Sequence, residues 1–351
     1  MSKVILYPDV QFEGEPSIEA AIAGTAYSLR VSRGGDLSSF SPEDFANAVA
    51  LVCYHEIAIT RELLNRLPNL KVVVRAGVGF DNIDIEAAGA LGVAVCNTPD
   101  YGTTDVADHA IALTLALTRG VVRYNDLIRQ DPSDGWNFRL GATVRRSSTL
   151  TFGIVGLGRI GTATALRAKA LGMRVLFYDP GLSTGTELAL GLERAKSLQD
   201  LLAVSDVLSL HTPLNDTTRG MISRDAFSQI KPGAFVINTA RGGVLDLGAL
   251  HEALRDQKIS AAALDVAEIE PLPASHPLMA DWLANQHDLR ERLIFTPHAA
   301  FYSPSSLIDL RSKSAKTAVN YLRNGWSPDS VNDRLLNRSL AAPKLQEGKA
   351  V

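Results

Sequence analysis

Three side chains suited to acid–base chemistry and anion binding occur in order in the second half of the chain: Arg241, Glu270 and His298. Arg241 and His298 each follow a short apolar run that is typical of a buried strand. A guanidinium there can bind a carboxylate through two hydrogen bonds and polarise a carbonyl. An imidazole can exchange a proton with an alcohol, and a neighbouring carboxylate would stabilise its charged form. The set predicts chemistry on a substrate with a carboxylate next to an alcohol or carbonyl.

Two of these roles have alternatives at this point. Glu268 shares one face of an extended stretch with Glu270, so spacing alone does not say which carboxylate serves the imidazole. Asp246 and Asp265 are alternative ion-pair partners for Arg241, which would make that arginine a structural residue.

A glycine cluster precedes these residues. Gly156, Gly158 and Gly161 follow an apolar run and open a helical pattern, so backbone amides and the positive helix end can hold a pyrophosphate. Arg159 lies in the turn and suits a pyrophosphate contact. About 20 residues further on, Asp179 closes the next strand pattern, where a carboxylate binds ribose hydroxyls and repels a 2′-phosphate. The cluster predicts a site for NAD rather than NADP.

A second glycine-bearing turn lies in the first hundred residues. Arg75, Gly77 and Gly79 follow a β-branched run, and the exposed amides of such a turn can bind a substrate carboxylate. Arg75 would reinforce that site. The alternative is an ordinary connection with turn glycines. Tyr101 either donates its hydroxyl to substrate or packs at a hinge.

Short β-branched runs alternate with amphipathic stretches along most of the chain, which predicts a doubly wound, mostly parallel α/β sheet. One long helix is expected from Thr103 to about Gln130, followed by a loop or arm over 131–148 and a last helix over 305–323. The predicted strands are Val4–Tyr7, Leu51–Cys53, Val72–Val74, Val93–Cys96, Phe152–Val155, Val175–Tyr178, Val207–Leu210, Phe235–Asn238, Ala261–Leu264 and Leu293–Phe295. The predicted helices between strands are Ile59–Leu67, Ile85–Leu91, Ile160–Leu171, Leu198–Ala203 and Ala249–Asp256.

Length and composition limit the function classes. A chain of 351 residues with 46% hydrophobic content is expected to form two domains. We expect residues 1–102 and 300–335 to form one domain, 103–299 to be inserted within it, and 336–351 to be a flexible tail. The formal net charge of −3 argues against nucleic-acid binding and favours a small-molecule partner.

Other sequence features suggest a metal-free protein of the cytoplasm. Cys53 and Cys96 lie in apolar runs and are expected to be reduced core residues. The start of the chain does not read as a signal peptide, and no apolar run reaches membrane-spanning length. The seven histidines are scattered without a metal-binding motif.

Ordered motifs over about Leu51–Asn332 resemble the D-isomer-specific 2-hydroxyacid dehydrogenase family. They are Arg75-Ala-Gly-Val-Gly-Phe-Asp-Asn-Ile-Asp, Gly156-Leu-Gly-Arg-Ile-Gly, His211-Thr-Pro-Leu, Asn238-Thr-Ala-Arg-Gly-Gly-Val-Leu-Asp and Thr296-Pro-His-Ala-Ala-Phe-Tyr-Ser. The resemblance implies an NAD-binding Rossmann-type sheet inserted into a smaller, flavodoxin-like α/β substrate domain. It also implies a homodimer formed through an arm of the cofactor domain.

The resemblance also assigns residues. It implies that Arg241, Glu270 and His298 are catalytic, and it selects the glutamate that immediately precedes proline. With the residues argued above, the substrate-binding candidates are Arg75, Gly77, Val78, Gly79, Tyr101 and Phe301. The cofactor-binding candidates are Thr104, Gly156, Gly158, Arg159, Ile160, Asp179, His211, Thr212, Pro213, Thr239, Ala240, Arg241, Asp265 and His298.

The local likeness is greatest to the C-terminal binding proteins of this family, which suggests a non-enzymatic rival: an NAD(H)-binding sensor or corepressor. Two features depart from them, Phe301 in place of a tryptophan beside the substrate and a long, charged segment over 272–292. A phosphite dehydrogenase is a second rival. Formate dehydrogenases carry glutamine in place of Glu270, which disfavours that activity. The expected reaction is NAD-dependent interconversion of a D-2-hydroxy acid and its 2-oxo acid.

Overall fold

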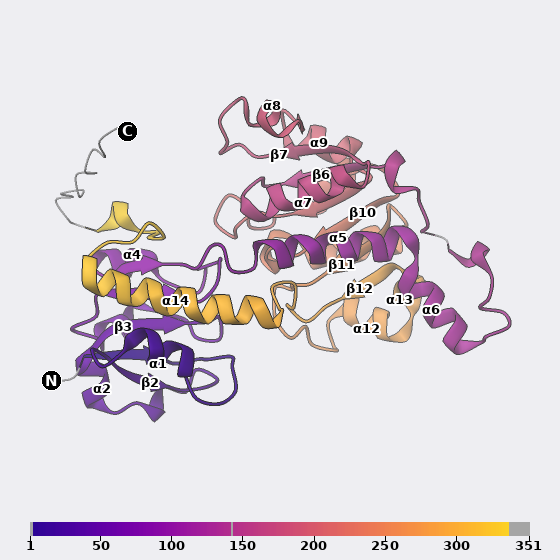
Figure 1. The fold of residues 1–351 in the computed structure, drawn as a ribbon. Coiled ribbons are helices and arrows are strands. Elements are labelled where there is room, and N and C mark those ends of the chain that lie inside the picture. The colour runs from indigo at the N-terminus through magenta and orange to yellow at the C-terminus, as the bar shows by residue number, and fades with distance from the viewer. Residues whose placement is uncertain (1–2, 142, 337–351) are drawn as a thin grey trace. The chain divides into compact units, whose positions relative to one another are not determined.

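The computed structural model describes residues 3–141 and 143–336, and the chain divides into two compact units (Figure 1). One unit comprises Met1–Tyr101 together with Leu307–Val351, and the other comprises Gly102–Ser306. The second unit is therefore an insertion within the first. Apart from Leu336, the predicted tail lies outside the described residues.

The first unit is built on a five-stranded parallel sheet in the order β2-β1-β3-β4-β5. This is the flavodoxin-like strand order. The strands are β1 (Val4–Tyr7), β2 (Ser28–Val31), β3 (Ala48–Cys53), β4 (Val72–Arg75) and β5 (Ala94–Cys96). The helices are α1 (Ser17–Ala23), α2 (Pro42–Asn47), α3 (Arg61–Asn65), α4 (Ile85–Ala90) and α14 (Pro304–Asn324). The sequence analysis missed β2, whose four residues are only partly buried and lack an apolar run.

Both faces of this sheet are covered, so its inner strands consist of continuous apolar residues. Along β1, Val4 and Leu6 pack into one apolar cluster and Ile5 and Tyr7 into another. On one face α14 is anchored to α1 by a salt bridge in which Nε and Nη2 of Arg311 each lie 2.8 Å from a carboxylate oxygen of the buried Glu19.

The second unit is built on a seven-stranded parallel sheet in the order β12-β11-β10-β9-β6-β7-β8. Strand order reverses at β6, as in the Rossmann fold. The strands are β6 (Thr151–Val155), β7 (Arg174–Tyr178), β8 (Glu193–Arg194), β9 (Val207–Leu210), β10 (Ala234–Asn238), β11 (Ile259–Leu264) and β12 (Leu293–Phe295). The helices are α5 (Thr103–Arg119), α6 (Val121–Gln130), α7 (Arg159–Ala170), α8 (Thr186–Leu190), α9 (Leu198–Val204), α10 (Arg224–Gln229), α11 (Leu247–Arg255), α12 (Pro277–Ala284) and α13 (Leu289–Arg292). The predicted α/β class is confirmed in both units.

The predicted single helix from Thr103 to Gln130 is wrong. The chain breaks into α5 and α6 at Gly120, which adopts a left-handed conformation with φ of 64°. A Cβ at Gly120 would lie 3.3 Å from Val144 and 3.4 Å from Tyr124, so glycine also allows the close packing of the arm at this corner.

The long segment over 272–292 forms α12 and α13 and packs beside the edge strand β12. Leu278 and Leu289 are fully buried in the core of the second unit. The Trp282 indole N–H donates to the Leu293 carbonyl at 2.9 Å, and its ring meets Phe295 edge-on. These helices cover the edge strand and so protect it from pairing with another chain. The long segment over 272–292 therefore has a structural role.

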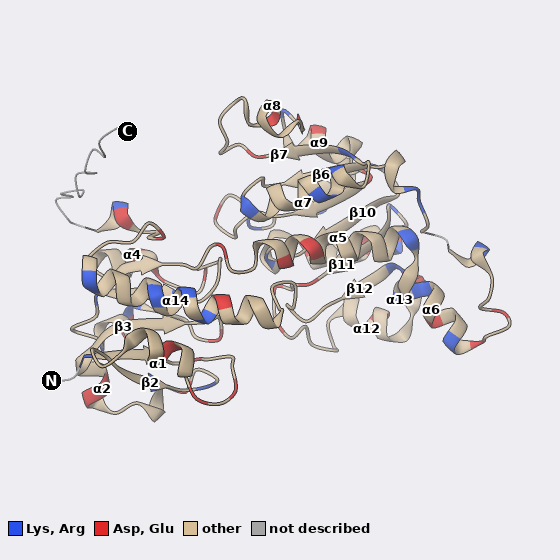
Figure 2. Cartoon of the chain, viewed as in Figure 1, with Lys and Arg blue, Asp and Glu red and all other residues tan. Residues whose placement is uncertain are grey.

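Positions of Lys or Arg and of Asp or Glu are interspersed along both units (Figure 2). Among the described residues, no helix combines the length and apolarity needed to span a membrane. Cys53 and Cys96 are buried free thiols, as expected.

Candidate active site

The predicted functional residues of the second unit gather at one edge of its sheet. Because all neighbouring strands are parallel, the residues that follow them emerge at a common carboxyl edge. The glycine turn follows β6, Asp179 follows β7, His211 follows β9, and Arg241 follows β10. Glu270 comes after β11 and His298 after β12. The topology therefore brings segments far apart in sequence to one side of a single sheet.

His298 and Glu270 form the central pair of this edge. Nδ1 of His298 lies 2.6 Å from Oε2 of Glu270, and Oε1 of Glu270 accepts a hydrogen bond from the Ala267 amide at 3.0 Å. The carboxylate is thereby oriented toward the ring, where it selects a proton on Nδ1 and stabilises the imidazolium. Spacing left Glu268 and Glu270 equivalent, and the structure places Glu270 against the ring.

The turn that carries His298 is held by Asp265, a residue only 2% exposed. The His298 amide donates to the Asp265 carbonyl at 2.8 Å, and the amides of Ala299 and Ala300 donate to its carboxylate at 2.9 and 3.0 Å. His298 itself has a φ of 51°, a left-handed conformation that costs a non-glycine residue energy. Asp265 offsets that cost, so its carboxylate supports the histidine turn.

Arg241 emerges from a turn that is shaped by Asn238, a fully buried residue whose positioning role the sequence analysis missed. The Asn238 amide nitrogen donates to the Arg241 carbonyl at 3.0 Å, and its oxygen accepts from the Ala240 amide at 3.0 Å. The guanidinium Nη1 donates to the Ala240 carbonyl at 2.8 Å. Asp246, the other alternative partner, accepts from the Ala249 amide as the cap of α11. The sequence feature that could have indicated this role is an asparagine at the end of an otherwise apolar strand.

Glycine at position 242 has a structural reason. A Cβ at this position would lie 1.9 Å from the carbonyl carbon of Ala267 and 2.3 Å from the Glu268 amide nitrogen. The backbone after Arg241 therefore packs directly on the loop that presents Glu270. Only glycine allows this contact.

The glycine turn leaves space where a diphosphate would be bound. A Cβ at Gly156 would lie 2.8 Å from the His211 carbonyl oxygen, and one at Gly161 would lie 2.1 Å from the Gly156 carbonyl oxygen. These two glycines permit a tight turn and close helix packing. Gly158 has no heavy atom within 4 Å of that position, and it caps α7, whose first amides point toward this space. Asp179 accepts from the Leu157 amide at 2.8 Å, which ties this carboxylate to the turn.

Three buried polar atoms beside this turn have no hydrogen-bond partner among the described residues: Nδ1 of His211, Oγ1 of Thr212 and Oγ1 of Thr239. Buried polar atoms are nearly always paired, so such a group indicates ligand contacts. Burial lowers the pKa of His211 to about 4, and Ser209 lies 2.8 Å from its Nε2. The imidazole is therefore neutral near pH 7. Together with the open glycine position, these atoms fit a dinucleotide.

The remaining candidates differ in exposure. Arg159 begins α7 and is exposed, and Ile160 beside it is half-buried. Pro213 is exposed, while Thr104 is exposed on α5 and its hydroxyl lies 3.4 Å from Asp105. Phe301 meets the His298 ring edge-on, with 6.2 Å between ring centroids.

The substrate-loop candidates lie in the first unit. Gly77 has a φ of 148°, and a Cβ there would overlap the Arg75 guanidinium, which folds over the glycine and donates from Nη1 to the Ala76 carbonyl at 2.7 Å. Arg75 is only 7% exposed. The Val78 carbonyl accepts from the Asn97 side chain at 2.7 Å, which braces the loop, and Tyr101 packs against the apolar cluster of the first unit.

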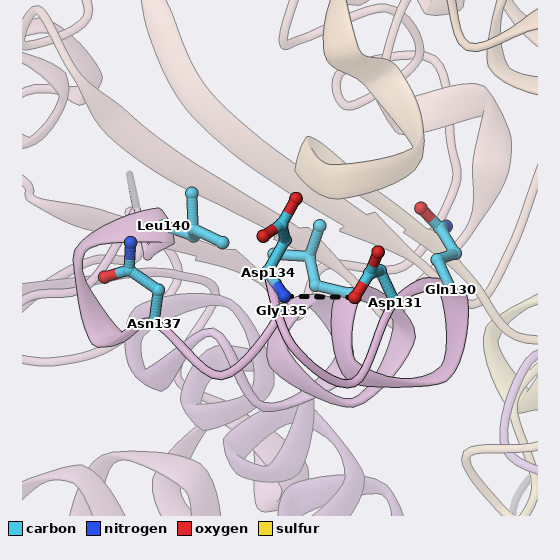
Figure 3. Close-up of a pocket in the computed structure, with 7 residues that line it drawn as sticks. Gln130, Asp131, Asp134, Gly135, Asn137 and Leu140 are labelled. Carbon is cyan, nitrogen blue, oxygen red and sulfur yellow. Dashed lines mark hydrogen bonds between the residues drawn. The ribbon is translucent and has the colours of Figure 1, made fainter.

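An open pocket of about 340 Å³ lies in the arm at the end of α6, separate from the residues above (Figure 3). Asp131 accepts from the amides of Ser133 and Asp134 and, through its carbonyl, from Gly135. These contacts close the end of the helix, so the pocket is explained as part of this turn. No group of ligating side chains suited to a metal ion occurs among the described residues.

Comparison with known proteins identifies relatives. Residues 111–300 match the model of the D-isomer specific 2-hydroxyacid dehydrogenase, NAD binding domain. A glyoxylate reductase from Aeropyrum pernix is 38% identical over 77% of this chain and 79% of its own length. C-terminal-binding protein 1 of Caenorhabditis elegans is 37% identical over 81% of this chain but only 38% of its own length. The structure of D-lactate dehydrogenase from Aquifex aeolicus, complexed with NAD and lactic acid, aligns with a TM-score of 0.79 at 29% identity, covering 94% of this chain and 99% of that one.

Proposed function

We propose, since the chain belongs to the D-isomer-specific 2-hydroxyacid dehydrogenase family, that it interconverts a D-2-hydroxy acid and its 2-oxo acid with NAD. The observation that carries the proposal is the His298–Glu270 pair, joined at 2.6 Å on the same sheet edge as Arg241 and the glycine turn. It is the combination that proton transfer beside a dinucleotide requires.

The dinucleotide, when bound, supplies or accepts a hydride at its nicotinamide ring. The glycine turn and the start of α7 hold its diphosphate, and Asp179 binds the adenosine ribose and disfavours a 2′-phosphate. Thr212, Thr239 and the neutral His211 contribute hydrogen bonds from atoms that lack a partner within the described chain.

His298 transfers the substrate proton. Because Nδ1 is engaged by Glu270, Nε2 is the nitrogen that takes the hydroxyl proton during oxidation and returns a proton to the carbonyl oxygen during reduction. Glu270 stabilises the imidazolium that exists on one side of each transfer. Arg241 binds the substrate carboxylate and polarises the C2 oxygen, a task that suits its planar, two-pronged donor set.

The substrate contacts in the first unit form part of the same proposal. The amides of Gly77, Val78 and Gly79 bind the substrate carboxylate, and Arg75 supports the loop that presents them. Tyr101 is a further candidate for substrate contact in this unit, and Phe301, which meets the His298 ring, is one in the second unit. Glyoxylate heads the candidate substrates because a glyoxylate reductase is 38% identical to this chain.

The test is consumption of NADH with glyoxylate, pyruvate, hydroxypyruvate, phenylpyruvate and branched 2-oxo acids. A clear preference would establish the reductase and describe its pocket. Absence of turnover across the panel, with NADH binding intact, would contradict the proposal.

A second candidate is an NAD(H)-binding sensor, favoured by the 37% identity to C-terminal-binding protein 1 over 81% of this chain. This function predicts that NADH changes the assembly of the protein while no 2-oxo acid is reduced. Measuring NADH affinity, oligomeric state and turnover on one preparation separates the two functions.

We further propose a homodimer formed through the arm that follows α5. Trp136 and Phe138 are 79% and 80% exposed there, and Val121 is 58% exposed at the start of α6. Large apolar side chains gathered in this way are typical of an interface. A second copy of the chain is the partner that the family resemblance implies.

A further inference from the structure

His109 on α5 lies next to the residues that hold the His298 turn. Its Nε2 is 3.1 Å from the Thr296 hydroxyl and 3.7 Å from Oδ1 of Asp265. His109 is a partly buried residue of α5, with a side chain 25% exposed.

The contact continues from Thr296 to the histidine turn. The Thr296 hydroxyl donates to Oδ1 of Asp265 at 2.5 Å, and the same carboxylate accepts from the Ala299 and Ala300 amides. The Asp265 carboxylate thus links the Thr296 hydroxyl to the backbone amides of the two residues that follow His298. Its side chain is 1% exposed, so few of these bonds can be replaced by water.

The direction of the hydrogen bonds determines what His109 contributes. An ionised carboxylate only accepts, so the single Thr296 proton points to Asp265. The Thr296 oxygen therefore accepts from His109, which must carry a proton on Nε2. The chain of donors runs from His109 through Thr296 to Asp265, and each bond strengthens the next in a partly buried site.

We propose that His109 is a positioning residue for His298, acting through Thr296 and Asp265. Its Nε2 proton aligns the Thr296 hydroxyl, which anchors the carboxylate that holds the backbone after His298 in its left-handed turn. The kinetic consequence rests on the function proposed above. The structural consequence, a more firmly held segment over 298–300, does not depend on it.

Two pairs of variants separate hydrogen bonding from packing. Thr296→Val keeps the shape but removes the hydroxyl, whereas Thr296→Ser keeps the hydroxyl. His109→Phe removes the donor, whereas His109→Gln places an amide N–H near the position of Nε2. His251, on α11 of the same unit, provides the control. Its Nε2 lies 2.8 Å from Oδ2 of Asp281, outside the site.

We expect Thr296→Val and His109→Phe each to lower kcat by about three- to tenfold, the effect of one lost hydrogen bond. NADH affinity and the KM for the 2-oxo acid should change little. Amide hydrogen exchange should accelerate in the peptide containing residues 298–300. The serine and glutamine variants should recover most of both properties, and His251→Gln and His251→Phe should resemble the parent protein.

Wild-type kinetics and exchange in both hydrogen-bond-deleting variants would overturn the proposal. Equal damage from the conservative and the deleting variants would also overturn it, because the role would then be packing. If His109→Phe does not fold, wild-type kinetics and wild-type exchange in Thr296→Val alone would overturn the proposal. If the parent protein reduces no 2-oxo acid, the proposed function fails, while the exchange measurement still tests the positioning.

Discussion

His298 and Glu270 lie 28 residues apart in sequence but are joined by 2.6 Å between Nδ1 and Oε2, and each is held by a separate backbone contact. The Glu270 carboxylate is fixed by the Ala267 amide, and the His298 amide by the Asp265 carbonyl. The pair is therefore oriented before any substrate binds, as efficient proton transfer requires.

Replacing either member of this pair should separate catalysis from cofactor binding. We expect His298→Asn to lower kcat by about 10²–10⁴-fold, the usual contribution of a general acid–base group. Glu270→Gln should lower kcat less, because it keeps a hydrogen-bond acceptor but loses the charge that stabilises the imidazolium. NADH affinity, measured by fluorescence titration, should remain close to that of the parent protein. Retained turnover in His298→Asn would remove this residue from the mechanism.

Gly158→Ala and Gly242→Ala should damage different properties, NADH binding in the first and stability in the second. An added methyl at Gly158 meets no atom of the chain but enters the space assigned to the diphosphate, so folding should be unchanged and NADH binding severely weakened. An added methyl at Gly242 meets the backbone of the loop before Glu270, and overpacking of this kind costs about 1–3 kcal/mol.

The measurements for this glycine pair are thermal unfolding and NADH titration. Gly242→Ala should lower Tm and kcat together, whereas Gly158→Ala should lower affinity at unchanged Tm. Normal NADH affinity in Gly158→Ala would show that the diphosphate is not bound at this turn.

Asp179 should set the choice between the two nicotinamide dinucleotides. Asp179→Asn keeps the shape and one acceptor for the Leu157 amide but loses the charge that repels a 2′-phosphate. Hydrogen bonds to a charged group contribute about 1.5–3 kcal/mol, so the ratio of NADH to NADPH affinity should fall by about tenfold or more. An unchanged ratio would refute the ribose role.

His211 should make stability depend on pH in the weakly acidic range. Burial lowers its pKa from 6.5 to about 4, so the unfolded chain binds a proton more readily than the folded chain between these values. The stability contributed by the neutral ring is present above pH 6.5 and is lost as the pH falls toward 4. The loss approaches about 3 kcal/mol.

The check is urea unfolding of the parent and of His211→Gln at several pH values. Subtraction of the two profiles removes the contribution of other titrating groups, since only His211 differs. His251→Gln should keep the parental profile. A His211→Gln profile parallel to the parent's would contradict the lowered pKa.

Side chains of the arm should control the association of two copies of the chain into a dimer. Trp136→Ser combined with Phe138→Ser removes the most exposed apolar pair of the arm, and we expect the dimer to dissociate at concentrations where the parent remains associated. Sedimentation velocity measures this directly. Leu188→Ser on α8, at a leucine 83% exposed outside the arm, should leave association unchanged. A monomeric parent protein would refute the proposed homodimer.

The sequence by itself determined the fold class and the order of the functional motifs. Strands of a parallel sheet are rich in apolar residues, and β9 and β12 are found at their predicted bounds. The residues directly after such strands are known from sequence position alone. The weakly patterned strands β2 and β8 escaped prediction because neither carries an apolar run.

Tertiary structure decided what depends on contacts between distant segments. Spacing left Glu268 and Glu270 equivalent, and only the fold of the loop after β11 brings one carboxylate to the imidazole. The support of His298 by Asp265 and the packing of Gly242 on Ala267 likewise join different strands. A local pattern contains propensity and periodicity, but a hydrogen bond across a sheet edge exists only once neighbouring strands have paired.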